Sequence, residues 1–213
     1  MKKIILALFM LVFLTGCTPV QKMNIEDIVN DRISKDIRLT NEHRAGYKYY
    51  LPKGMKINDK SSYNEKIKSG NYTYYLYVDV VSYYNKVIDK FESKDDVYYS
   101  SSIDYQEKFG YLEIKNIKDD KYIIEIMYNY AKIEVIVNED DINVAVSNAI
   151  NVLSSIEYND TMINKLIGEE TSSFNELEYN IFETTNDSTY LEFVNDEDSE
   201  QVEEEIHDTD LVN

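Results

Sequence analysis

The sequence predicts an α+β domain with a mainly antiparallel sheet of about six or seven strands, flanked by an N-terminal and a C-terminal helix. Apolar residues recur every second residue through most of residues 46–138, which is typical of strands. They recur every three or four residues on either side of that stretch, which is typical of amphipathic helices. An acidic segment without Lys or Arg follows from residue 168, and it marks the end of the domain.

The chain opens with the pattern of an export signal. Lys2 and Lys3 precede an uninterrupted apolar run over residues 4–14, which as a helix would be about 16 Å long. Such a run is too short for a hydrocarbon core of roughly 30 Å. A basic start, a short apolar middle and an exit through small residues are the three parts of a secretory signal.

The Leu-Thr-Gly-Cys motif at residues 14–17 resembles the lipobox of bacterial lipoproteins. The resemblance implies that Cys17 receives a diacylglyceryl group and that a peptidase cuts between Gly16 and Cys17, removing residues 1–16 as a signal peptide. It implies a protein held by its lipid on the extracytoplasmic side of the cell membrane, with residues 17–23 as a tether. The alternatives are an ordinary secretory signal or an uncleaved helix with an incidental cysteine. Because Cys17 is the only cysteine, acylation would leave no thiol for other chemistry.

The first predicted element of the domain is a helix over residues 25–36. Asn24 is placed to cap its N-terminus. The polar face is acidic rather than rich in Lys, so we expect this helix to pack on the domain and not on lipid. Its apolar residues share one face: Ile25, Ile28, Val29, Ile33 and Ile37.

Strands follow the first helix. A Pro-x-Gly turn at 52–54 separates two short strands, and Ser69-Gly70-Asn71 predicts a hairpin. The strand after that hairpin, from Tyr72 through Val81, has apolar residues on both faces and should be covered on both sides. Residues 85–96 fit either a short helix or a charged loop.

Further strands run from residue 97 to residue 138, with turns near 118–120 and 129–131, and connections this short predict antiparallel pairing. A wide apolar stripe then predicts a helix over residues 142–156, opened by three acids. The order of hairpin, helix and short terminal strand over residues 122–158 resembles the C-terminal half of PsbP-like domains. These are antiparallel sheets flanked by helices, and several occur on lipoproteins; the resemblance implies no functional residue.

The net charge of −18 is concentrated in residues 168–213, which hold sixteen acidic residues and no Lys or Arg. We therefore expect a single domain over 24–167 and a largely disordered acidic tail. The apolar clusters of the tail are candidate docking motifs for a protein partner, with strands added to the domain or a solvated tail as the alternatives. Their principal residues are Phe174, Leu177, Tyr179, Phe182, Tyr190 and Phe193.

Several kinds of chemistry are disfavoured. The isolated glycines build no phosphate loop or dinucleotide fingerprint, and the acidic balance disfavours nucleic acid. A calcium loop starting at Asp196 fails because Gln201 and His207 occupy the positions of its glycine and its last glutamate. His43 is predicted to lie in a loop. We expect no metal and no cofactor.

We therefore expect a membrane-anchored, non-enzymatic lipoprotein that acts as a protein-interaction or accessory domain. One alternative is a binding module for a cell-envelope sugar or peptide, with the tyrosine-rich stretch 72–84 as its platform. A carboxylate-dependent hydrolase is the other. A cleft that gathers acids and tyrosines would favour the two alternatives.

Overall fold

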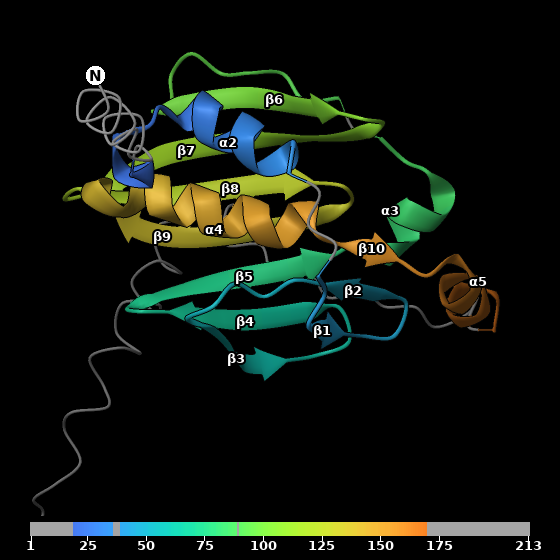
Figure 1. Cartoon of the computed structure of the whole chain (residues 1–213). Helices are drawn as coiled ribbons and strands as arrows, with labels where there is room; N and C mark the ends of the chain where they lie inside the picture. The colour runs from blue at the N-terminus through green and yellow to red at the C-terminus, as the bar shows by residue number, and fades with distance from the viewer. Residues whose placement is uncertain (1–18, 36–38, 89, 170–213) are drawn as a thin grey trace, which may run out of the picture. The chain divides into compact units, whose positions relative to one another are not determined.

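The computed structural model describes residues 19–35, 39–88 and 90–169 of the 213-residue chain. The fold is α+β, as predicted, with a seven-stranded antiparallel sheet, a three-stranded sheet and flanking helices (Figure 1). The elements in chain order are η1 (Val20–Lys22), α2 (Ile25–Ile33), β1 (Glu42–His43), β2 (Tyr47–Tyr49), β3 (Met55–Lys60), β4 (Asn64–Ser69), β5 (Tyr72–Val78), α3 (Val80–Asn85), β6 (Tyr99–Tyr105), β7 (Lys108–Lys118), β8 (Lys121–Tyr128), β9 (Ala131–Asn138), η2 (Glu139–Asp141), α4 (Ile142–Ser154), β10 (Glu157–Tyr158) and α5 (Asp160–Glu169).

The large sheet has the strand order β3-β4-β5-β9-β8-β7-β6, and the small sheet has the order β1-β2-β10. Residues 106–107, 119–120 and 129–130 form two-residue hairpin turns in the large sheet. Both residues of each turn have positive φ, between 46° and 65°, although none of them is glycine. This geometry suits the right-handed twist of the strands, and it confirms the turns predicted near 118–120 and 129–131.

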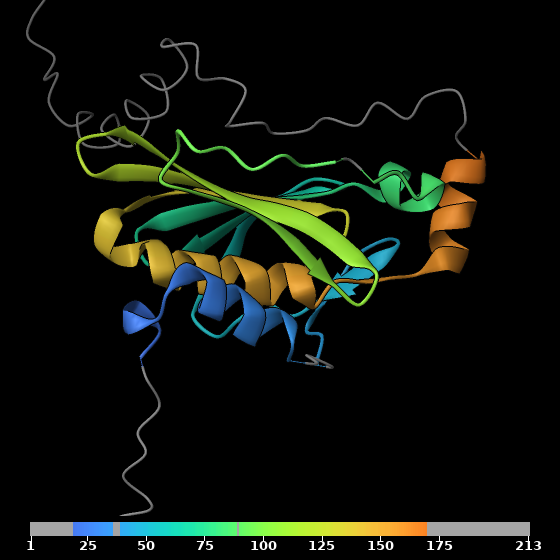
Figure 2. The same cartoon turned by 90° about the horizontal axis from the view of Figure 1, so that it is seen from above.

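The main core lies between the large sheet and α4. Ile124 and Ile126 of β8 lie opposite Val135 and Ile133 of β9, and all four are 0% exposed. α4 packs on β8 and β9, and α2 packs on α4, so both helices lie on one side of the sheet (Figures 1 and 2). The predicted stripe of α4 supplies the other half of the core through Ile142, Ala145, Val146, Ala149, Ile150 and Leu153, all buried.

The N-terminal elements are tied to α4 by polar contacts as well. Asn24 caps α2 as predicted, accepting a hydrogen bond of 2.8 Å from the Asp27 N–H. The Asn143 side-chain amide contacts three backbone carbonyls around η1, at 3.4 Å from Val20, 3.2 Å from Gln21 and 2.8 Å from Met23. The chain is therefore fixed to the start of α4 from residue 20 onward.

The predicted strand from Tyr72 through Val81 is too long in its last part. β5 ends at Val78, and α3 begins at Val80. The reason is Asp79, whose carboxylate accepts a hydrogen bond of 2.6 Å from the Ser82 N–H and so caps a helix inside the apolar run. In the ambiguous stretch 85–96, α3 ends at Asn85, and the other described residues up to 96 are neither helix nor strand.

The short terminal strand is present as β10, but it pairs with β2 in the small sheet. α5 was not predicted as a separate element. α5 packs against Gly46. There φ is +92°, and an added Cβ would lie 3.0 Å from the Ile163 side chain, so glycine suits both the backbone conformation and the close packing. No helix in the described parts of the chain has the length and apolar character needed to cross a bilayer.

A buried ion pair connects the two sheets. Glu65 of β4, 2% exposed, accepts two hydrogen bonds from the Arg44 guanidinium: 2.9 Å from Nε to Oε1 and 2.6 Å from Nη2 to Oε2. The hydroxyls of Tyr49 and Tyr47 of β2 also donate to this carboxylate, at 2.8 and 3.3 Å. Burial raises the pKa of Tyr49 well above its usual range, and the Glu65 charge adds to the shift.

We predict that Arg44→Ala lowers the free energy of unfolding by about 3–5 kcal/mol, because Glu65 would be left buried without its counter-charge. Denaturant unfolding would measure this. Lys48→Ala is the matched control, since the Lys48–Glu157 pair at 2.8 Å is exposed and should cost no more than about 1 kcal/mol. The double change R44A/E65Q should recover part of the loss. Equal losses for R44A and K48A would contradict the assignment.

Candidate functional site

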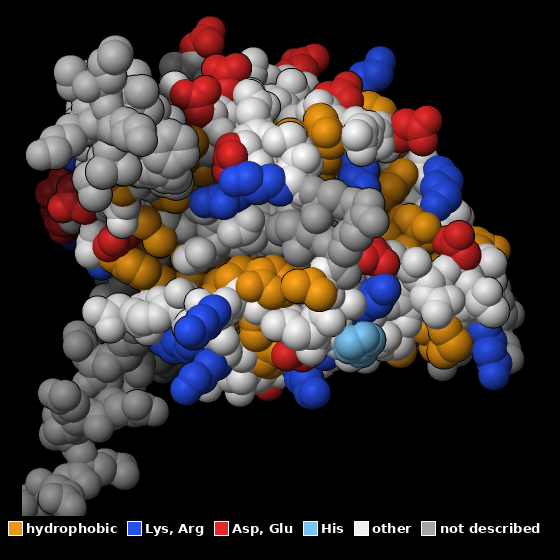
Figure 3. All heavy atoms as spheres, viewed as in Figure 1, with side chains coloured by type: hydrophobic (Ala, Val, Ile, Leu, Met, Phe, Trp, Pro, Cys, Tyr) orange, Lys and Arg blue, Asp and Glu red, His pale blue; other side chains and the backbone are white. Residues whose placement is uncertain are grey.

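The residues singled out from the sequence as sites lie outside the described parts of the chain, so the structure does not place them. They are Gly16, Cys17, Phe174, Leu177, Tyr179, Phe182, Tyr190 and Phe193. His43, predicted in a loop, lies instead in the short strand β1, and it is exposed as the pale-blue side chain of Figure 3. No group of three His, Cys, Asp or Glu side chains within the described residues could hold a metal ion.

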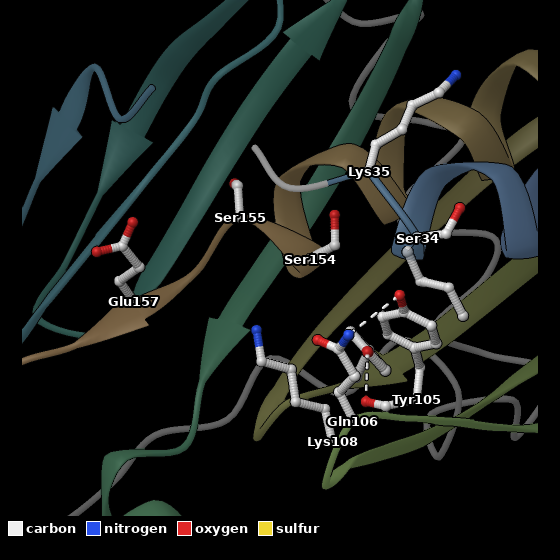
Figure 4. Close-up of a pocket in the computed structure, with 10 residues that line it drawn as sticks. Ser34, Lys35, Tyr105, Gln106, Lys108, Ser154, Ser155 and Glu157 are labelled. Carbon is white, nitrogen blue, oxygen red and sulfur yellow. Dashed lines mark hydrogen bonds between the residues drawn. The ribbon is translucent and has the colours of Figure 1, made fainter. Parts of the chain in front are cut away.

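The structure shows a cavity of about 310 Å³ where α2 and α4 end beside the β6–β7 turn (Figure 4). This volume is at the lower end of the range found for small-molecule sites. Side chains from four different parts of the fold line it: Ile33, Ser34, Lys35, Tyr105, Gln106, Lys108, Tyr128, Ser154, Ser155 and Glu157.

Helix ends and a hairpin turn place these side chains. The Ser155 hydroxyl, at the C-cap of α4, donates to the Val152 carbonyl at 2.7 Å and accepts from the Tyr50 N–H at 2.9 Å. Lys35, just past the end of α2, is held by an ion pair of 2.6 Å with Asp31. Gln106 stands in the turn at positive φ. The cavity is thus lined mainly by the C-terminal ends of α2 and α4 and by the β6–β7 hairpin turn.

The cavity offers aromatic surface together with hydrogen-bonding groups. The Gln106 amide donates to the Tyr105 hydroxyl at 3.2 Å, and the Tyr128 hydroxyl donates to the Tyr105 carbonyl at 3.4 Å. The Ser154 hydroxyl oxygen is buried and has no hydrogen-bond partner within the described residues. Glu157 is the only carboxylate among the lining residues. This chemistry suits binding of a small polar molecule better than catalysis by paired carboxylates.

A second cluster lies on the face of the large sheet opposite α4. Glu113, Glu125 and Glu134 occupy directly opposed positions on β7, β8 and β9, and they are 1%, 7% and 0% exposed. Their neighbours in the strands are apolar residues of the core, which face the other way because side chains alternate along a strand. Three adjacent buried carboxylates therefore cross the middle of the sheet.

Each carboxylate of this row has a different partner set. Glu113 forms ion pairs with Lys94 at 2.9 Å and Lys115 at 2.8 Å. Burial alone would raise the pKa of Glu113, but the hydrogen bonds and charges of the two lysines outweigh burial and lower it. Glu134 pairs with Lys132, at 3.2 Å between Nζ and Oε1.

Glu125, in the middle of the row, is 7% exposed and has a raised pKa. Burial raises the pKa of Glu125 to about 7, and the neighbouring Glu134 adds to the shift. The Tyr111 hydroxyl donates to Glu125 at 2.5 Å and opposes the shift, as does the positive charge of Lys132. Glu125 therefore changes charge in the physiological range, but it faces away from the α2–α4 side on which the cavity lies.

Sequence reasoning missed both places. The three glutamates did leave a signal, because a single Glu stands among apolar residues in each of the stretches "YLEIK", "YIIEIM" and "KIEVIV". The shared pattern predicts one polar row once the strand register is known. The cavity left no comparable signal, since its residues come from four separate segments spread over residues 33–157.

No family model matches the chain, and no curated protein matches it at a significant level.

We predict that the folded protein loses stability as pH rises from about 5 to 8. The pKa of Glu125 is about 7 in the fold and 4.5 as a free side chain, so the fold favours the protonated carboxyl. The stabilisation from the protonated Glu125 carboxyl is complete below the pKa of the free side chain. It decreases by up to about 1.4 kcal/mol per pH unit as pH rises, and it is lost once pH passes the pKa in the fold.

Glu125→Gln tests the pH prediction, because an amide replaces the neutral carboxyl. Denaturant unfolding at several pH values should show a flatter slope for E125Q and greater stability than the unmodified chain at pH 8. Glu26→Gln, at an exposed position of α2, should keep the original slope. A slope that E125Q leaves unchanged would show that other groups dominate.

Proposed function

We propose that the protein is a membrane-anchored lipoprotein that holds a non-enzymatic protein-interaction or accessory domain on the extracytoplasmic side of the cell membrane. The observation that carries this proposal is the Leu-Thr-Gly-Cys motif at the end of a short, basic-to-apolar leader. Two acyl chains on Cys17 would attach the chain stably, since each buried CH₂ contributes about 0.8 kcal/mol.

The contacts behind the motif support a domain held close to its lipid. Only Thr18 and Pro19 separate Cys17 from η1, which begins at Val20. At no more than about 3.5 Å per residue, the fixed part of the fold would start within roughly 10 Å of the acylated residue. Asn143 fixes that part to α4 through the carbonyls around η1. The start of α4 would therefore be the part of the domain nearest the membrane.

The same geometry would set the cavity apart from the membrane. α4 runs from Ile142 to Ser154, about 20 Å, with Asn143 near one end and the cavity-lining Ser154 at the other. A cavity at the end far from the lipid would be open to molecules of the cell envelope. The cavity and the anchor would thus lie at opposite ends of α4.

We predict that Cys17→Ser abolishes incorporation of a labelled fatty acid and moves the protein out of the membrane fraction. Thr18→Ser is the control, because it changes the next residue and leaves the thiol in place. Labelling of cells followed by fractionation would show both effects. Acyl label that persists in C17S would overturn the anchor assignment.

The second candidate function is binding of a small cell-envelope ligand, and the cavity is the observation that favours it. The half-buried Tyr105 ring can stack on the apolar face of a sugar, while Gln106 and Lys108 offer hydrogen bonds to its hydroxyl groups. Such a site would bind its ligand without catalysing a reaction.

Titration calorimetry with short N-acetylhexosamine oligomers tests this second candidate. We predict that Gln106→Ala weakens binding about fivefold, the equivalent of one neutral hydrogen bond of about 1 kcal/mol. Gln21→Ala, at an exposed position within η1, should leave the affinity unchanged. An absence of heat with the oligomers, or equal weakening in both variants, would exclude sugar binding in this cavity.

A further inference from the structure

The two edges of the seven-stranded sheet are built differently. β3 forms one edge, and its register with β4 shifts between Ile57 and Asp59, which marks a bulge or irregularity. β3 also carries the charged side chains of Lys56, Asp59 and Lys60. Bulges and charged residues, lysines above all, are the means by which proteins keep an edge strand from pairing with another chain. β3 is therefore a protected edge.

β6, at the other edge, lacks this protection. Its seven residues pair with β7 without a break, from Tyr99 opposite Ile114 to Tyr105 opposite Lys108. The strand contains no Lys, Arg or Pro, and Asp104 is its only charged residue. No described strand pairs with its outer side, and the described helices leave β6 uncovered in Figure 2, which is a view onto this edge. An unbroken edge with a single charge is a template for another strand.

The backbone groups of alternate β6 residues point outward. In a hairpin with a two-residue turn, the residues that flank the turn form a hydrogen-bonded pair, which here is Tyr105 with Lys108. Such pairs alternate with non-bonded pairs, so the backbone of Asp104 does not bond to Phe109. The Phe109 carbonyl points the other way, since it accepts from the Asn129 N–H at 3.1 Å. The residues whose N–H and C=O groups face away from β7 are therefore Ser100, Ser102 and Asp104.

β6 matches a second copy of itself. The strand has a tyrosine at each end and Ser102 at its centre. When two β6 strands lie antiparallel with their Ser102 residues opposed, Ser100 of each copy lies opposite Asp104 of the other. The pairs formed in this register use all the outward N–H and C=O groups of both strands, because each pair exchanges two hydrogen bonds. The Ser102 carbonyl accepts from the Ser101 hydroxyl at 3.1 Å, and its second lone pair is left for the other strand.

The side chains fit the same register. Tyr99 of one copy lies opposite Tyr105 of the other, and both are partly buried residues that pack against the core. Cross-strand aromatic pairs of this kind stabilise a sheet. On the other face, the Ser100 hydroxyl accepts from the Lys94 N–H at 3.0 Å and keeps its own proton to donate to the Asp104 carboxylate of the second copy. No like charges are opposed, because each Asp104 faces a serine.

We infer that the protein forms a symmetric dimer in which β6 pairs antiparallel with β6 of a second copy, about a two-fold axis at Ser102. The axis is perpendicular to the sheet, so the two seven-stranded sheets join into one and the helices of both copies lie on the same side. The inference rests on the sheet edge and does not depend on the lipid anchor or on the cavity.

The axis also determines where the N-terminal elements of the pair lie. Because it reverses the strand direction, the two copies of η1 lie at opposite ends of the joined sheet, both on the helix side. A pair in which both copies carry a lipid would sit with its helix side toward the membrane, whereas a single copy would stand on the start of α4.

Single-cysteine variants test the register. The background is the mature chain with Cys17→Ser, in which an introduced cysteine is the only thiol. Opposed residues of a hydrogen-bonded pair have Cα atoms about 5.5 Å apart, within the range of a disulfide. Ser102→Cys should therefore give a covalent dimer on mild oxidation. Ser100→Cys alone should not, since its two copies would lie about 14 Å apart along the strands. A mixture of S100C and D104C chains should link unlike chains, which mass spectrometry would identify.

Sedimentation equilibrium measures the pairing without a cross-link. Ser102→Pro should weaken the dimer at least about fivefold, because proline removes an N–H that the second copy needs and that β7 does not use. Ser102→Thr keeps this N–H and should leave the dimer unchanged. Thermal unfolding would establish that both variants are folded, and the cysteine variants decide the matter if S102P is not.

Three results would each overturn the inference. The first is a chain that stays monomeric at every concentration. The second is linking of S100C alone as efficient as that of S102C. The third is a dimer that a folded S102P variant leaves intact.

Discussion

The packing of the apolar stripe of α4 on β8 and β9 is the contact on which the other parts of the domain depend. It buries the two central strands of the large sheet, whose inward residues are fully excluded from solvent. α2 reaches the sheet through α4, and the chain around η1 is fixed by an α4 side chain. The cavity lies where α4 ends. Loss of this packing would therefore displace the N-terminal elements and the cavity together.

The small sheet depends on a different kind of contact. It is too short to bury a core of its own, and the Arg44–Glu65 pair with two tyrosine hydroxyls holds it to β4. Such an arrangement is costly to desolvate and is retained only with full hydrogen bonding. The ion pair orients the small sheet where little apolar area is available, and in that sheet the first and last strands, β1 and β10, lie on either side of β2.

Periodicity in the sequence predicts the α+β class, the capped N-terminal helix, the hairpin turns and the long C-terminal helix, because these features depend on neighbours within a few residues. Periodicity fails to predict the structure where a distant contact or a single polar contact determines it. α3 follows from the Asp79 cap inside an apolar run, and β2 pairs with β10, in which Glu157 lies opposite Lys48. The division into two sheets, the carboxylate row and the cavity all require the register, which local patterns do not contain.

The Asn143 contacts have a mechanical consequence. A pull on the chain at Pro19 would act on η1 and α4 together, because the Asn143 amide of α4 contacts the carbonyls of Val20, Gln21 and Met23. The pulling force would be transmitted through α4 to β8 and β9, which are joined by backbone hydrogen bonds. Rotation of the domain about its N-terminus would be restricted for the same reason. A single asparagine thus couples the chain around η1 to α4 and, through α4, to the sheet on which α4 packs.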